Sequence, residues 1–243
     1  MNTPPAPVSA TLGVLTRIFR TGLLCWAGAI AVVFLAIGYS IARWGQPDRS
    51  IWAYSGTTVR WVLLVLGILV APLLFRVAVA HGVTRRGFAA ACATGFGLLA
   101  AATGCYMAVG FLVERAFYAA GDHPTTLMQP HLFDSTDQLH LVFAEYALLA
   151  GACLVTGWLV GVGYLRLGWF FGTLALPLAI FPTAAVEYLL GTRPSTTWGL
   201  DGFEATAELP VGVAIPLAAA TVGLGLLFGR WLLHGAPVKS RIS

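Results

Sequence analysis

The sequence predicts an all-α polytopic membrane protein with six transmembrane helices and an N-terminal interfacial helix. Hydrophobic residues make up 58% of the 243 residues and charged residues only 10%, with a mean hydropathy of +0.82, which excludes an ordinary water-soluble domain. Several apolar runs reach about 20 residues, enough for a helix to cross a hydrocarbon layer about 30 Å thick. The runs are continuous and lack the alternation of barrel strands.

The elements divide the chain into three parts. Residues 1–10 are rich in proline and predict a disordered cytoplasmic N-terminus, and residues 236–243 predict a cytoplasmic tail. Residues 11–235 form the predicted transmembrane domain. It opens with Leu and Phe at helical spacing over residues 12–19, which favours a helix lying at the inner membrane interface. The six spans are expected at residues 22–42, 61–80, 88–113, 141–165, 168–190 and 209–233.

Basic residues predict the orientation, because Lys and Arg are enriched in cytoplasmic loops. With the N-terminus inside, nine of the 14 basic residues fall on the cytoplasmic side. We therefore expect a multi-pass protein of the bacterial plasma membrane with both termini in the cytoplasm. The net charge of +4 follows from this sorting and requires no nucleic-acid partner. The inner set is Arg17, Arg20, Arg76, Arg85, Arg86, Arg166, Arg230, Lys239 and Arg241, and the outer set is Arg43, Arg49, Arg60, Arg115 and Arg193.

The segment AHGVTRRGF, residues 80–88, concentrates polar residues between the second and third spans. Gly82 can adopt backbone conformations that other residues avoid, and Thr84 can cap a helix. Two interpretations of Arg85 and Arg86 remain. They are positive charges that anchor the topology, or they form, with Phe88 behind them, a short helix that docks into a cleft of a soluble protein.

This order of elements resembles the permease subunit of type-2 ATP-binding-cassette (ABC) exporters, in particular actinobacterial members. The resemblance rests on the interfacial helix, the six spans, the two inner termini and HGVTRRGF at residues 81–88. Residues 191–208, after the fifth span, form a shorter outer region than many members have. The resemblance implies a second permease copy or a related permease, and export of a substrate such as an antimicrobial peptide or a drug. It also implies a coupling helix that contacts the ATPase, formed by Gly82, Val83, Thr84, Arg85, Arg86 and Phe88.

The energy for transport is expected from a separate ATPase subunit. The sole lysine, Lys239, is not part of a G-x-x-x-x-G-K-[ST] phosphate-binding loop. The sequence also lacks H-E-x-x-H, G-x-S-x-G and a pair of Asp residues within the spans, so an intramembrane protease is not predicted. We assign no catalytic residue, metal or cofactor to this chain and expect no enzymatic activity from it alone.

Two other functions stay open. One is a small haem-binding or electron-transfer membrane subunit, with His81 and His234 as haem ligands. The other is an accessory integral membrane protein without transport activity. His123, His131 and His140 belong to a long outer loop. Their spacing fits no known pattern of metal ligands, so we expect a solvated loop rather than a metal site.

Two carboxylates lie in or near the spans. Glu145 is expected about one turn inside the fourth span, where it pairs with a basic group, lines the pathway, is protonated, or faces outer water at the interface. Glu187 follows Pro177 and Pro182, which loosen or kink the fifth span. That helix is therefore either a gate with a polar tip or a bent but static element.

Two G-x-x-x-G pairs predict close helix packing. Gly157 and Gly161 lie in the fourth span, and Gly225 and Gly229 lie in the sixth. Contacts within one subunit are favoured over contacts across a dimer.

Overall fold

The computed structural model describes residues 28–29, 31–34, 36–37, 39, 50, 52–119, 130–192, 207 and 209–235. The predicted all-α class is confirmed, because these residues form helices and their connections, with no strand among them. The helices with defined bounds are α2 (Trp52–Ala80), α3 (Arg85–Ala119), α4 (Leu139–Leu174), α5 (Leu176–Leu189) and α7 (Val211–His234).

Within the described part of the chain, α2, α3, α4 and α7 are long and apolar enough to cross a membrane. The chain is therefore a membrane-embedded helical protein, whereas the count of six spans stays a prediction. The first predicted span falls largely outside the described residues. Residues 1–10, 11–21 and 236–243 fall wholly outside them.

The predicted fifth span, residues 168–190, is not one continuous helix. Gly168 has φ 76° and ψ −176°, which breaks α4 near its end. The following α5 has 14 residues and is about 21 Å long, shorter than a hydrocarbon layer of about 30 Å. The hydropathy pattern gave no sign of this break, because a glycine with positive φ interrupts a helix without changing the apolar character of the segment.

α2 and α3 extend beyond their predicted bounds, and a side chain of α3 satisfies the start of α2. α2 begins at Trp52 rather than residue 61, and α3 continues to Ala119 rather than residue 113. Glu114 of α3 accepts a hydrogen bond from the Trp52 backbone N–H at 2.8 Å and another from the Ser50 hydroxyl at 2.6 Å. A carboxylate at this position satisfies a free amide and opposes the positive end of the helix dipole.

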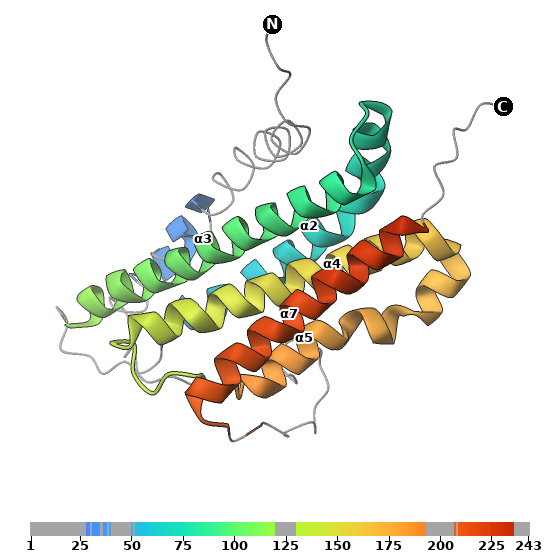
Figure 1. The fold of residues 1–243 in the computed structure, drawn as a ribbon. Coiled ribbons are helices and arrows are strands. Elements are labelled where there is room, and N and C mark those ends of the chain that lie inside the picture. The colour runs from blue at the N-terminus through green and yellow to red at the C-terminus, as the bar shows by residue number, and fades with distance from the viewer. Residues whose placement is uncertain are drawn as a thin grey trace, which may run out of the picture.

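The central helix is α4, which runs through the bundle with the other helices packed around it (Figure 1). It contacts α2, α3, α5 and α7. Its middle is buried over successive turns, and Leu149, Leu154 and Trp158 are fully enclosed. A helix that is apolar all round is expected at such a central position.

Glycines set the distance between α4 and its neighbours. A Cβ on Gly157 or Gly161 would overlap backbone carbonyls of α2, and a Cβ on Gly67 of α2 would overlap a carbonyl of α4. Gly225 and Gly229 of α7 likewise pack against side chains of α4. Both predicted glycine pairs therefore make contacts within this chain.

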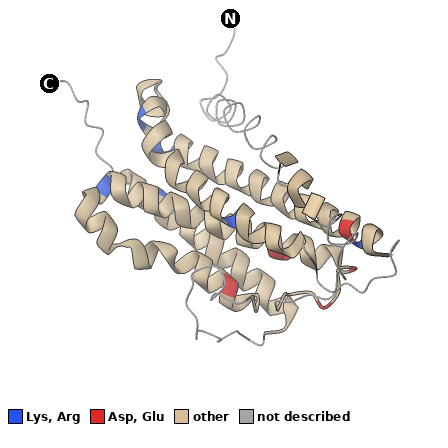
Figure 2. Cartoon of the chain, turned by 180° about the vertical axis from the view of Figure 1, so that it is seen from behind, with Lys and Arg blue, Asp and Glu red and all other residues tan. Residues whose placement is uncertain are grey.

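Charged groups separate toward the two ends of the bundle (Figure 2). We call the end with the α2–α3 connection, residues 81–84, the turn end. We call the opposite end, where residues 130–138 join the start of α4, the loop end. Among the described residues, Arg76, Arg85, Arg86, Arg166 and Arg230 lie on helix segments near the turn end. The predicted orientation would place the turn end in the cytoplasm.

Candidate functional site

An ion pair is buried between α2 and α5. Arg60 Nη1 donates a hydrogen bond to Glu187 Oε1 at 3.2 Å, and the side chains are 7% and 0% exposed. Arg60 lies in the third turn of α2, about 12 Å along the helix. Arg60, which was counted with the outer residues, therefore lies within a helix near the loop end and is buried. Glu187, the expected polar tip of the fifth span, is also buried.

Polar side chains continue from this ion pair along α5. Thr183, one helical turn before Glu187, shares a hydrogen bond of 2.8 Å with Thr156 of α4. Both hydroxyl groups are buried. Since polar groups in a membrane interior are costly unless they are paired, this line of polar residues marks a functional candidate.

Glu145 is fully buried near the start of α4. His131 Nδ1 lies 2.8 Å from Oε1, and the Leu132 backbone N–H donates to Oε2 at 2.7 Å. The imidazole and the carboxyl group therefore share one hydrogen bond, and a backbone amide satisfies the second carboxyl oxygen. Of the predicted alternatives, an interfacial Glu145 facing water is wrong, and the partner is a histidine from the preceding segment.

Residues 130–138 fold over the loop end as a flap. The His131 ring stacks on Phe133 with centroids 4.7 Å apart, and Phe133 packs edge-on against Phe111 of α3 at 5.8 Å. Arg115 of α3 forms an exposed ion pair with Asp137. The predicted solvated position is therefore wrong for His131, whose side chain is buried, whereas Asp134 and Asp137 of the same segment are exposed. His123 lies outside the described residues, and His140 is an exposed residue of α4.

The α2–α3 turn contains no separate helix, because α3 itself begins at Arg85. Gly82 adopts the expected positive φ of 79°. Thr84 Oγ1 accepts a hydrogen bond from the Gly87 N–H at 3.1 Å, as expected of a helix cap. Phe88 is fully buried against Phe75, with centroids 5.4 Å apart.

The proposed docking residues are thus divided between the surface and the interior. Gly82, Thr84 and Arg86 are exposed, whereas Val83 and Phe88 belong to the core. An apolar docking face that includes Phe88 is therefore wrong.

Arg85 contacts the end of α7. Its Nη1 donates to the Leu233 carbonyl at 3.4 Å and also to the His234 carbonyl. Arg166 of α4 donates to the Leu232 carbonyl at 3.3 Å. These bonds add to those that the Gly235 N–H makes with the Leu232 and Leu233 carbonyls, and the positive charges complement the negative end of the helix dipole. We call Arg85 and Arg166 the arginine clamp.

Pro177 and Pro182, which were expected to loosen or kink the fifth span, both lie within α5. Pro177 is exposed in the first helical turn, where its missing N–H costs little. Pro182 is buried inside α5. The interruption between α4 and α5 lies earlier, at Gly168 and Ala175.

The two histidines of the haem hypothesis are exposed rather than enclosed between helices. His81 shares a 2.8 Å hydrogen bond with the carbonyl of Val77, one turn away, and His234 is exposed at the end of α7. A search restricted to the described residues finds no cluster of three or more potential metal ligands. Comparisons with protein-family models, curated proteins and solved structures give no match.

Proposed function

We propose that this chain is the permease subunit of an ABC exporter, working with a separate ATPase and a second permease copy or a related permease. The observation that supports it best is the connection between the polar turn and α7. Arg86 is exposed beside the turn, while its neighbour Arg85 bonds to the last carbonyls of α7. A partner that moves this turn would therefore pull on a membrane helix directly.

The proposed site of ATPase docking is the exposed surface formed by Gly82, Thr84 and Arg86. A guanidinium group on such a surface suits an acidic cleft of a soluble partner. The membrane-embedded bundle supplies the path, and closure of the ATPases shifts its helices between two states. The substrate would be a compound such as an antimicrobial peptide or a drug.

The test is purification of the tagged chain in mild detergent from the cells that naturally produce it. We expect Mg-ATP hydrolysis in the wild-type complex and at least about tenfold less with Arg86→Glu, because reversing the charge repels an acidic cleft. Arg76→Glu is the matched control, since Arg76 is also exposed near the turn end but lies outside the turn. Wild-type preparations without any ATP-hydrolysing companion would refute the proposal.

A further inference from the structure

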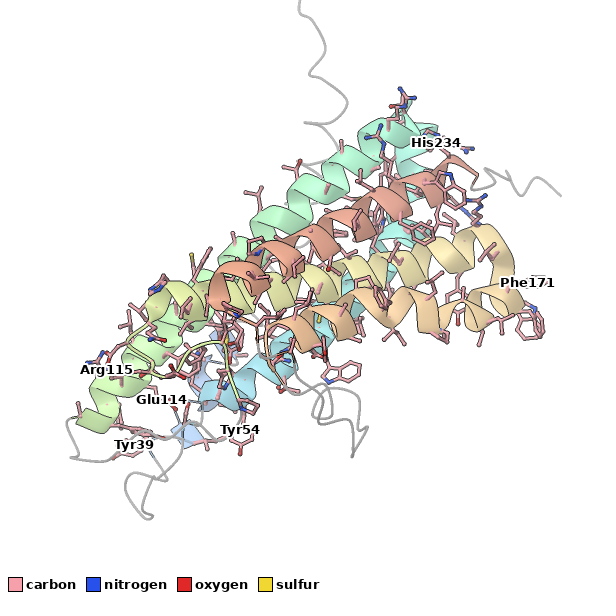
Figure 3. The ribbon with its side chains drawn as sticks, turned by 60° about the horizontal axis from the view of Figure 1, so that its bottom comes forward. Tyr39, Tyr54, Glu114, Arg115, Phe171 and His234 are labelled. Atoms are coloured by element: carbon pink, nitrogen blue, oxygen red, sulfur yellow. The ribbon has the colours of Figure 1, made fainter. Side chains whose placement is uncertain are left out.

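An aromatic cavity of about 150 Å³ opens at the loop end. It lies between helical residues of segment 28–39, the start of α2 and the last turns of α3. Two of its lining residues, Tyr39 and Glu114, are labelled at this end in Figure 3, opposite Phe171 and His234. The aromatic residues that line it are Phe34, Tyr39, Trp52, Tyr106, Phe117 and Tyr118.

The rings around the cavity stand at steep angles to one another. Phe34 and Trp52 meet at 81° with centroids 6.1 Å apart, Trp52 and Tyr106 at 54° and 5.3 Å, and Tyr39 and Phe117 at 72° and 6.5 Å. Rings that stand at steep angles are not stacked on one another, and together they form a box of aromatic walls around the cavity. Because aromatic faces carry partial negative charge, such a box attracts cations.

Trp52 is held firmly in this arrangement. Its indole N–H donates to the Met107 carbonyl at 3.2 Å. The ring lies against Gly110, where any Cβ would overlap the indole. The wall of the cavity is therefore fixed before any ligand arrives, which lowers the entropic cost of binding.

Glu114 is the charged residue among the described residues that line the cavity. Its carboxylate accepts hydrogen bonds from the Ser50 hydroxyl and the Trp52 amide. These bonds orient the carboxylate beside the aromatic rings. An apolar wall with a carboxylate at its edge suits a cation that carries apolar substituents, whereas a small inorganic cation would lose its hydration without replacement.

We propose that this cavity binds a quaternary or alkyl-substituted ammonium group. Its volume matches that of cavities that hold a benzene-sized group, which is also about the size of a trimethylammonium group. Export of this ligand would depend on the proposed function, whereas its binding to the cavity needs neither the ATPase nor ATP.

The test compares two probes of the same shape, choline and its neutral analogue 3,3-dimethylbutan-1-ol, on the purified full chain in detergent. Equilibrium dialysis measures binding. We expect choline to bind at least about tenfold more tightly than the neutral analogue, because only choline is attracted by the rings and the carboxylate. Equal affinity would show an apolar cavity without cation selectivity and would overturn the proposal, as would a lack of choline binding.

Two variants identify the site. Glu114→Gln should weaken choline binding about tenfold, and Phe117→Leu should weaken it several-fold. The Phe117 ring is 45% exposed, so its replacement should leave the fold intact even if Glu114→Gln disturbs the start of α2. Asp137→Asn and Phe170→Leu are matched controls outside the cavity and should bind choline like the wild type. Unchanged affinity in both cavity variants would refute this location.

The outcome is separable from that of the ATPase test. Because the chain is studied alone in detergent, absence of choline binding leaves the exporter proposal intact. Absence of an ATPase companion likewise leaves the ammonium site intact.

Discussion

Removing one member of the Arg60–Glu187 pair should strongly destabilise the bundle. At a separation of 3.2 Å and an effective dielectric constant of about 20, the attraction between the two charges is about 5 kcal/mol. Desolvation offsets much of this, but a single substitution removes the opposite charge of this pair from beside a buried charged group. We therefore expect Glu187→Leu or Arg60→Met to lower the free energy of unfolding by about 3–5 kcal/mol.

The double variant Arg60→Met with Glu187→Leu provides the decisive comparison. Because well-packed apolar residues can replace a buried ion pair at little cost, its stability should return to within about 1 kcal/mol of the wild type. Unfolding in mixed detergent and SDS micelles, followed by circular dichroism, measures all four proteins of the cycle. The exposed pair Arg115–Asp137 is the control, and neutralising it should change stability by less than about 1 kcal/mol.

Two results would refute this reasoning. If the single variants at Arg60 and Glu187 were each as stable as the wild type, the charges would have to be hydrated rather than enclosed. If the double variant were as unstable as the sum of the single variants, the two side chains would not interact. In the exporter proposal, recovery of stability without recovery of ATP-driven transport would instead indicate that the pair takes part in transport.

Three further predictions address other parts of the bundle. Gly157→Ala should lower the unfolding free energy by at least about 1–3 kcal/mol, because the new Cβ meets a backbone carbonyl of α2. Gly163→Ala is the control and should cause no such loss, because open space surrounds Gly163. Equal melting temperatures for the two variants would contradict this prediction. Arg85→Met should lower the unfolding free energy by about 1.5–3 kcal/mol, because the hydrogen bonds to α7 are lost. Arg86→Met is the control and should leave the melting temperature unchanged. Similar melting temperatures for the two variants would argue against the role of Arg85 in the arginine clamp. His131→Asn should speed amide hydrogen exchange across the flap, because the buried Glu145 loses its imidazole partner. Exchange rates equal to those of the wild type would show that this hydrogen bond does not hold the flap in place.

The sequence allowed the helical class and the close packing of the two glycine pairs to be predicted. Long apolar runs and G-x-x-x-G spacing are local signals that report directly on lipid and on helix contact. Thr84 and Gly82 were also identified correctly, since capping and positive φ depend on the residue and its immediate neighbours.

Contacts between distant segments were the part that could not be predicted. Arg60 and Glu187 are separated by 127 positions, so nothing local distinguishes Arg60 from an ordinary interfacial arginine. The burial of Phe88 and the contact of Arg85 with α7 likewise depend on where other helices lie. His131 carried a usable signal, because pairing with a basic group was one of the interpretations of Glu145 and requires a partner such as a histidine of the adjoining loop.

In the exporter proposal, the adjacent residues Arg85 and Arg86 have different roles. α7 is joined to α4 by the close packing of Gly225 and Gly229 along its length, whereas its link to the turn consists of hydrogen bonds from Arg85. Such bonds contribute about 1.5–3 kcal/mol each, so Arg85 would transmit a movement of the turn to the end of α7. In the exporter proposal, loss of Arg86 should therefore prevent the ATPase from binding. Loss of Arg85 should leave the ATPase bound but disconnect its movement from α7, which would appear as ATP hydrolysis without transport.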